Sequence, residues 1–168
     1  MSRLDLIPHS WWSWNFDVVR EESAIAQIGI SCWRENGTVD VAGTAYQVRR
    51  TSLLKGTYIL ESTDNVRIAQ AVRPSLGRRS FTIQYGMPSG SCTLQAASFC
   101  TRRLVLRDDS HEMGTITPAG SFTRQAQAEL PDQMPLAVQV FVLWLAVLLW
   151  KRESDAAAAT VAVVAAST

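Results

Sequence analysis

The side chains best suited to chemistry in this sequence lie in one short polar cluster. His111 and Glu112 directly follow Asp108–Ser110, and an imidazole beside carboxylates suits acid/base work or metal binding. Neighbouring residues in a tight turn point in different directions, however, and His9 is the only other histidine. Because Asp and Ser are typical turn residues, we expect a solvated hairpin turn here and no metal site.

The three cysteines give no second site. Cys32, Cys92 and Cys100 are odd in number and widely spaced, so neither a disulfide framework nor a zinc site is indicated. Free cysteine behaves as a small hydrophobic residue. We therefore expect reduced thiols and a cytoplasmic protein, with a peripheral or tail-anchored membrane location as the alternative.

Arginine pairs are the remaining charged feature. They occur at 49–50, 78–79 and 102–103, and consecutive strand residues face opposite sides of a sheet. A solvated surface is one interpretation. The other is a patch for an anionic headgroup or phosphate, because guanidinium groups form bidentate contacts with phosphate. The residues predicted for that patch are Arg49, Lys55, Arg73, Arg78 and Arg79.

Tryptophans are dense near the N-terminus, at positions 11, 12, 14 and 33. Tryptophan suits a packed core, a partner interface or a membrane interface. We expect Trp14 and Phe16 to pack on one strand face. Trp11 and Trp12, which precede that strand, are the better interface candidates.

Composition narrows the function classes. The 168 residues suit one domain, and the 47% hydrophobic content excludes a disordered chain. The 16 basic and 15 acidic residues leave a net charge of +1, which gives no reason to expect nucleic acid. No nucleophile elbow, P-loop, dinucleotide fingerprint or HExxH motif is present. We expect no cofactor and no enzyme activity.

Short β-type runs separated by turn residues fill the chain from about residue 14 to 130. Asn36-Gly37 predicts a type I′ hairpin between the second and third runs. Many short strands with period-two alternation favour an antiparallel barrel or a sandwich. The expected strands are residues 14–19, 25–34, 38–41, 44–50, 56–61, 66–72, 80–85, 92–96, 103–107, 113–117 and 122–128.

A single helix is predicted near the C-terminus, at about residues 133–153. Residues 136–150 are apolar except for Gln139, and a helix that is apolar on every side must be covered by protein or lipid. The apolar run measures about 22 Å at 1.5 Å per residue, and a bilayer core of about 30 Å usually needs ~20 residues. We therefore expect the helix to fill the barrel, and keep insertion into a membrane as the alternative.

The order of these segments resembles the tubby C-terminal-like superfamily, which includes the LURP-one-related proteins and the phospholipid scramblases. The stretches that carry the resemblance are GTYILES (56–62), RIAQAVRP (67–74), RRSFTIQY (78–85), RRLVLRDD (102–109), MGTITP (113–118) and LPDQMPLAVQVFVLWLAVLLWKR (130–152). The resemblance implies a closed antiparallel β-barrel of about 11–12 strands that encloses a hydrophobic C-terminal α-helix. It also implies phosphoinositide binding through a basic pocket, which the residues of this chain do not place. Resemblance to the scramblases further implies a palmitoylated cysteine-rich segment and a calcium-binding acidic stretch, but the three cysteines are not clustered and no EF-hand spacing occurs here.

The expected organisation has three parts. Residues 1–13 form an N-terminal extension, residues 14–153 form the barrel with its central helix, and residues 154–168 form an Ala-rich, disordered tail. We expect a non-enzymatic binding or scaffold module. The alternative is a membrane-associated protein that recognises anionic phospholipid headgroups or is anchored by the C-terminal helix. A protein partner is the other expected ligand class.

Overall fold

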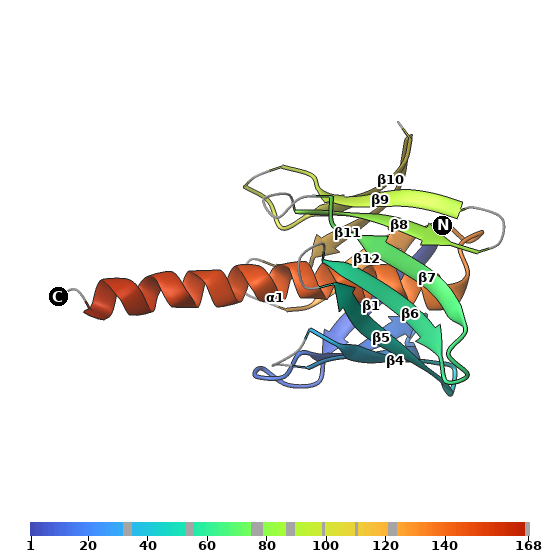
Figure 1. Cartoon of the computed structure of the whole chain (residues 1–168), viewed down its shortest axis with the longest axis horizontal. Helices are drawn as coiled ribbons and strands as arrows, with labels where there is room; N and C mark the ends of the chain where they lie inside the picture. The colour runs from blue at the N-terminus through green and yellow to red at the C-terminus, as the bar shows by residue number, and fades with distance from the viewer. Residues whose placement is uncertain are drawn as a thin grey trace.

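The computed structural model describes residues 1–31, 35–52, 56–74, 79–86, 90–98, 100–109, 111–120 and 124–166, with side chains as far as Ala162. Twelve antiparallel strands close into a barrel around one helix, α1 (Leu136–Ala166) (Figure 1). The predicted barrel with an enclosed hydrophobic C-terminal helix is therefore confirmed. The strands are β1 (Ser2–Pro8), β2 (Asn15–Arg20), β3 (Ser23–Ile30), β4 (Gly37–Val41), β5 (Thr44–Ser52), β6 (Thr57–Ser62), β7 (Arg67–Val72), β8 (Ser80–Tyr85), β9 (Gly90–Ala96), β10 (Leu104–Asp108), β11 (His111–Pro118) and β12 (Ala126–Leu130).

The topology is an up-and-down barrel. Each strand pairs with its neighbours in sequence, and β1 pairs with β12 to close the sheet. Successive connections therefore alternate between the two ends. The connections β1–β2, β3–β4, β5–β6, β7–β8, β9–β10 and β11–β12 lie at the end where α1 leaves the barrel, which we call the exit end (Figure 1). The other connections and the start of α1 lie at the opposite end.

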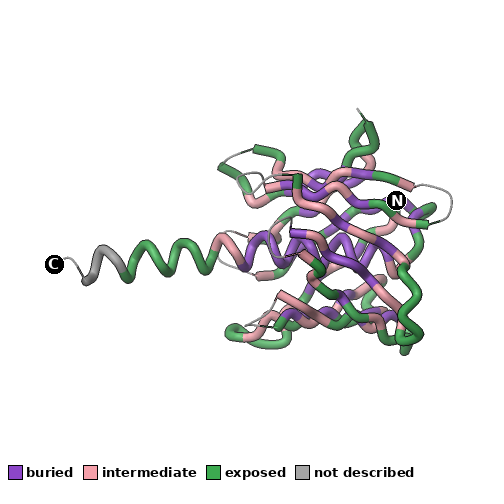
Figure 2. Tube along the Cα trace, in the orientation of Figure 1, coloured by how far each residue is buried: buried purple, intermediate pink, exposed green. Residues whose placement is uncertain are grey.

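The helix fills the barrel because the inner face of the sheet and the surface of α1 are both apolar. Strand side chains alternate, so that Leu4 and Leu6 of β1 and Phe81 and Ile83 of β8 are buried. Every residue of α1 from Val138 to Trp150 is at most 3% exposed, and Figure 2 shows this part of the rod as buried. The apolar run that sequence alone assigned to barrel or bilayer thus lies inside the barrel.

Two side-chain N–H donors of α1 inside the barrel are paired with main-chain oxygens, whereas the side-chain oxygen of Gln139 has no hydrogen-bond partner. The side-chain amide of Gln139 donates to the carbonyl oxygens of Pro131, at 3.1 Å, and Met134, at 2.8 Å. The indole nitrogen of Trp144 donates to the Gly29 carbonyl at 3.1 Å. A Cβ atom at Gly37 would clash with this indole. These bonds fix the rotation and depth of the helix, because a shift would leave buried polar atoms unpaired.

Two predicted boundaries are wrong. Residues 1–13 were expected outside the barrel, but Ser2–Pro8 forms β1, in register with β12 (Leu4 opposite Ala128) and β2 (Leu6 opposite Val18). Without this strand the barrel would have two open edges. Residues 154–168 were expected to be disordered, but α1 continues to Ala166. Alanine is the best helix former, and the buried helix removes the cost of nucleation.

The predicted turn at Asn36-Gly37 is also wrong in type, although its two strands do pair. Ile30 lies opposite Gly37, so six residues connect β3 and β4 instead of two. Asn36 uses its side-chain oxygen to accept a hydrogen bond from the main-chain N–H of Arg50 at 3.0 Å. This bond joins the loop to β5. Among the loop residues that the structure describes, Glu35 has a positive φ, of 48°.

Replacing Leu145 by arginine is expected to abolish soluble expression. Leu145 is fully buried in the middle of α1, and an unpaired charge there has no partner in an apolar interior. Ala157→Arg is the matched control, because Ala157 lies on the same helix and is exposed. The measurement is the soluble fraction and the size-exclusion profile. A folded, monodisperse Leu145→Arg protein would contradict the position of the helix.

Candidate functional site

Charged residues are separated along the barrel axis. At the opposite end, the described turn residues include five acidic side chains and no lysine or arginine: Glu21, Glu22, Asp64, Asp109 and Asp132. At the exit end, the described turn residues include five arginines and one acid: Arg73, Arg79, Arg102, Arg103, Arg124 and Glu35. Residues 151–155 of α1 add two cations there, Lys151 and Arg152, and two carboxylates, Glu153 and Asp155, and therefore no net charge. The net charge of +1 therefore conceals a strong polarity.

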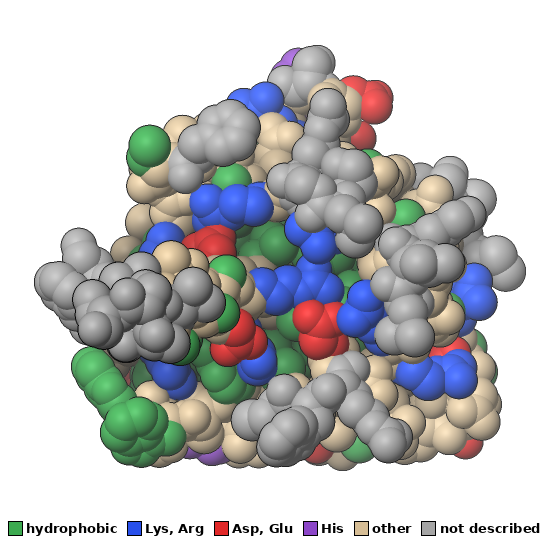
Figure 3. Space-filling view, turned by 60° about the vertical axis from the view of Figure 1, so that its left-hand side comes forward, with side chains coloured by type: hydrophobic (Ala, Val, Ile, Leu, Met, Phe, Trp, Pro, Cys, Tyr) green, Lys and Arg blue, Asp and Glu red, His purple; other side chains and the backbone are tan. Residues whose placement is uncertain are grey.

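Several of these cations surround the helix where it leaves the barrel. We call this group the collar. It consists of Trp14, Glu35, Arg50, Tyr58, Arg73, Arg79, Arg102 and Arg124 from the barrel and residues 150–153 from the helix. Figure 3 shows Lys and Arg side chains gathered on this face, with acidic side chains among them. As defined, the collar has seven basic and two acidic residues.

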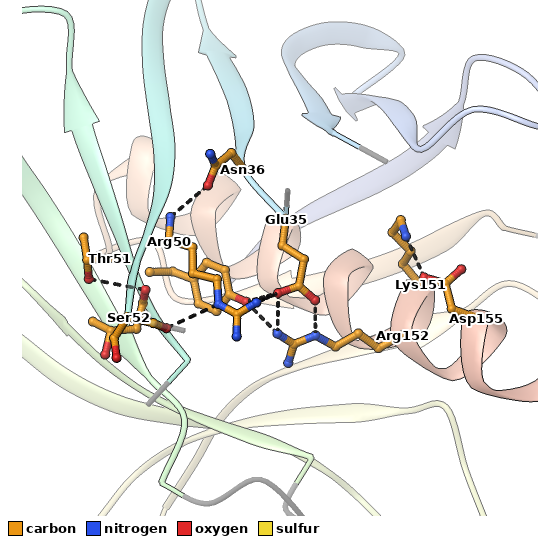
Figure 4. Close-up of polar contacts among 10 residues, drawn as sticks. Glu35, Asn36, Arg50, Thr51, Ser52, Lys151, Arg152 and Asp155 are labelled. Atoms are coloured by element: carbon orange, nitrogen blue, oxygen red, sulfur yellow. Dashed lines mark hydrogen bonds and ion pairs between the residues drawn. The ribbon is translucent and has the colours of Figure 1, made fainter. Parts of the chain in front are cut away.

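Glu35 is the centre of the collar (Figure 4). Its Oε1 accepts a hydrogen bond from Nε of Arg152 at 2.7 Å. Its Oε2 accepts from Nη2 of Arg152 at 2.8 Å, Nη1 of Arg50 at 2.6 Å and the hydroxyl of Tyr58 at 2.7 Å. The Tyr58 hydroxyl also accepts from Arg152 Nη2 at 2.6 Å. Strands β5 and β6, the β3–β4 loop and α1 thus meet at one carboxylate.

The titration of Glu35 and Tyr58 reflects this arrangement. Burial alone would raise the pKa of Glu35, but hydrogen bonds from Arg152 and Tyr58 and the charges of Arg152 and Arg50 outweigh it and lower the pKa to about 2. Burial, together with the hydrogen bond to Glu35, raises the pKa of Tyr58 well above its ordinary value. The Glu35 carboxylate is therefore held ionised and the Tyr58 phenol protonated. With Arg50 and Arg152 they form a structural ion-pair network in which neither group is a free base.

The left-handed backbone of Glu35 is part of the same contact. A φ of 48° is rare for a residue with a side chain and costs on the order of 1 kcal/mol. Hydrogen bonds to a charged group contribute about 1.5–3 kcal/mol each. The four bonds to Glu35 therefore offset the strain of the turn.

The rest of the collar packs cations on aromatic rings. The guanidinium carbon of Arg124 lies 4.3 Å from the ring centroid of Trp14, and the Lys151 ammonium lies 6.0 Å from the same ring. Arg102 lies 5.5 Å from the ring of Trp150, and its carbonyl oxygen accepts a hydrogen bond from that indole at 2.9 Å. These cation–π contacts hold positive charge at the surface of the barrel end.

The predicted anionic patch is only partly brought together. Arg73 and Arg79 belong to the collar, where Arg79 pairs with Glu153 of the helix and burial lowers the pKa of Arg73, with repulsion from Arg152 adding to the effect. Arg49 lies instead on the outer wall, 58% exposed, where its Nη2 donates to both carboxylate oxygens of Glu61 at 3.0 Å. Lys55 and Arg78 lie outside the described residues.

Sequence reasoning did not assign Glu35, Arg50, Arg102, Arg124 and Arg152 to a site. Their common signal is the order of the turns, because alternate connections of an up-and-down barrel share an end. Among the described residues, four connections at the opposite end carry acidic residues and three at the exit end carry arginines, whereas the other turns are uncharged apart from Glu35. The sequence shows the arginines as adjacent pairs along the chain. In the structure they are grouped by the end of the barrel at which they lie.

Other chemically suited residues are placed as follows. His111 starts β11 and is exposed next to the β10–β11 turn. Cys92 is buried, which raises the pKa of its thiol to about 12, and Cys100 is exposed; both are free thiols. Among the described residues, no group of three or more His, Cys, Asp and Glu side chains could hold a metal ion. Cys32 lies outside this part of the chain.

Two further surface features are relevant to binding. Trp11 and Trp12 of the β1–β2 connection are 68% and 86% exposed at the exit end, whereas Phe16 is buried and Trp14 packs against the core. A groove of about 910 Å³ opens at the opposite end beside the start of α1, where Ile68, Tyr85, Pro135 and Val138 contribute apolar surface. In the described part of the chain, no helix combines the length and apolar character needed to cross a membrane.

Replacing Glu35 by glutamine is expected to destabilise the fold by about 2 kcal/mol at neutral pH, because three charged or buried donors lose their common acceptor charge. The folded-state pKa of Glu35 is lower than its ordinary value of 4.5. Its contribution is therefore complete above about pH 4.5 and is lost as the pH falls toward 2. Urea unfolding at neutral pH and near pH 3 should show a smaller difference between wild type and variant in acid.

Glu61→Gln is the matched control for this prediction. Glu61 also accepts two hydrogen bonds from an arginine, but that arginine is largely exposed on the outer wall, where ion pairs contribute at most about 1 kcal/mol. Glu61→Gln should cost less than Glu35→Gln. Equal unfolding free energies for the two variants at neutral pH would show that the collar does not depend on Glu35.

Comparison with known proteins assigns no role to this site. No family model, no curated protein and no solved structure matches the chain. The function of the collar must therefore follow from its own charge, exposure and geometry.

Proposed function

We propose that this chain is a non-enzymatic binding module that docks the exit end of its barrel on an anionic membrane surface. The observation that carries the proposal is the separation of charge along the barrel axis, with arginines in the turns of one end and carboxylates in those of the other. Such a molecule is oriented by a negative surface, because the basic end is attracted and the acidic end repelled.

The side chains of the exit end suit phospholipid headgroups. Arginine forms bidentate hydrogen bonds with phosphate oxygens. Exposed Trp11 and Trp12 lie at the same end, and indole rings favour the boundary between headgroups and acyl chains. Together these residues provide both an electrostatic and an apolar contact with a bilayer surface. Nucleic acid has no acyl chains and would use only the electrostatic part in this way.

The absence of an enzyme role is part of the proposal. The described groups with strongly shifted pKa values are held in unreactive forms, since Cys92 and Tyr58 stay protonated and Glu35 is bound by two arginines. Each of these groups stabilises the fold. A binding role at the exit end needs only charge and exposure.

Membership of the tubby C-terminal-like superfamily is likewise a proposal. It rests on the order of the strand segments and on the apolar helix that follows them. The barrel and its buried helix agree with the architecture expected for that group. The collar supports an anion-binding role independently of that relationship, because its residues were identified from contacts in this chain.

Membrane binding is tested by reversing charge at the exit end. Arg102→Glu combined with Arg124→Glu should lower co-sedimentation with phosphatidylserine-containing vesicles at least tenfold, since each polybasic contact contributes about 1 kcal/mol. Wild-type binding should fall when salt is raised, because exposed charges are screened. Pure phosphatidylcholine vesicles should bind weakly.

The matched control is Arg67→Glu combined with Arg107→Glu. These arginines are exposed toward the opposite end, and the change in net charge is the same. Equal loss of vesicle binding by the two double variants would mean that only total charge matters. Wild-type binding that ignores both lipid charge and salt would rule out the proposal, and binding to an acidic protein alone would favour a protein scaffold.

A further inference from the structure

The helix does not end where the barrel ends. α1 continues as one rod to Ala166 and projects from the exit end (Figure 1). Figure 2 shows the change from buried to exposed along it. All described side chains from Ser154 to Ala162 are exposed, and Val161 is 68% exposed. A helix that fills a barrel has no packing reason to continue beyond it.

The projecting part has two zones of different chemistry. Charges are confined to residues 151–155, where Lys151 pairs with Asp155 at 2.6 Å and Glu153 pairs with Arg79. Residues 156–166, which we call the emergent helix, consist of seven alanines, three valines and one threonine. The charged zone lies in or next to the collar, and the uncharged zone lies beyond it.

We infer that the emergent helix inserts into the acyl region of the anionic membrane leaflet on which the collar docks, without crossing the bilayer. This inference rests on the proposed function. The emergent helix stands within the ring of arginines, so a surface that attracts the collar receives the helix first. Exposed Trp11 and Trp12 lie at the same end, at the depth where indole rings meet headgroups.

The length of the emergent helix fits one leaflet. Its 11 residues extend about 16 Å at 1.5 Å per residue, and half of a bilayer core measures about 15 Å. With the collar at headgroup level, the N–H groups of this segment are bonded to carbonyl oxygens one turn earlier in the helix, as the acyl region requires. The last four carbonyl oxygens of α1, which ends at Ala166, have no donor within the helix and need one from outside it. The paired charges of residues 151–155 remain in the headgroup layer.

A second copy of the chain is a less suitable occupant. Alanine-rich helices do pack closely against one another. Packing two emergent helices, however, would bring two exit ends together in either orientation, because the helix is only about 16 Å long. The collars, each with seven basic and two acidic residues, would then repel each other. An anionic leaflet complements the same charges.

Depth-dependent fluorescence quenching tests the insertion. A nitrobenzoxadiazole label is attached to Val161→Cys, or to Ser154→Cys as the matched control in the charged zone. Cys32 and Cys100 are replaced by serine, and Cys92 is left in place because it is buried. On phosphatidylserine-containing vesicles, we expect the label at 161 to be quenched by spin labels deep in the acyl chains and shielded from aqueous iodide. The label at 154 should show the reverse.

A substitution gives the second measurement. Val161→Asp should lower vesicle partitioning at least tenfold more than Ser154→Asp, which adds the same charge in the charged zone. If wild type does not sediment with anionic vesicles, the proposed function fails and the inference fails with it. If it sediments but the label at 161 remains open to iodide, the inference alone is wrong. Cross-linking between labelled positions in lipid-free solution would identify a second copy as the occupant.

Discussion

The structure depends on one constraint, which is that a helix without a polar face must be covered on every side. Thirteen consecutive residues of α1, from Val138 to Trp150, are at most 3% exposed. Burial at about 1.5–3 kcal/mol for each large apolar side chain makes the closed sheet and the helix mutually dependent. A sheet of this size with apolar side chains inside would otherwise enclose a void, and the helix alone would aggregate. β1 completes this cover by pairing with both β2 and β12.

Specificity comes from the few polar atoms at the two ends of the buried helix. Gln139 is bonded to the chain that leads into the helix, and Arg152 is bonded to Glu35 and Tyr58 where the helix leaves. Apolar contacts would allow the helix to slide along the barrel axis, whereas these hydrogen bonds would break if it did. Tyr58 connects the apolar core with the polar collar, because its ring packs against Phe81 and Trp144 in the core while its hydroxyl belongs to the collar. The collar thus sets the position of the helix within the barrel.

Sequence reasoning succeeded where a pattern is continuous and failed where one residue hides it. The uninterrupted apolar run predicted the central helix, and short β-type runs between turn residues predicted eleven of the strands. β1 was missed because Asp5 and Pro8 obscure the inward-facing Leu4 and Leu6. The loop before Gly37 was misjudged because Asn36 bonds to Arg50 across the sheet, a contact that local turn rules do not contain. Arg49 and Arg50 were equivalent in sequence, but one faces Glu61 and the other Glu35.

The separation of charge along the barrel axis is the most informative property of the surface, and the amino-acid composition does not show it. A net charge of +1 suggests a neutral surface, but an up-and-down barrel places alternate turns at opposite ends. Among the described residues, the turns rich in acidic residues fall at one end and the turns that carry arginines at the other, which gives the barrel a charge polarity along its axis. The central helix lies on that same axis and leaves through the basic end. In the proposed docking on an anionic membrane, charge attraction and the apolar emergent helix therefore act in one direction. The groove at the opposite end takes no part in that docking.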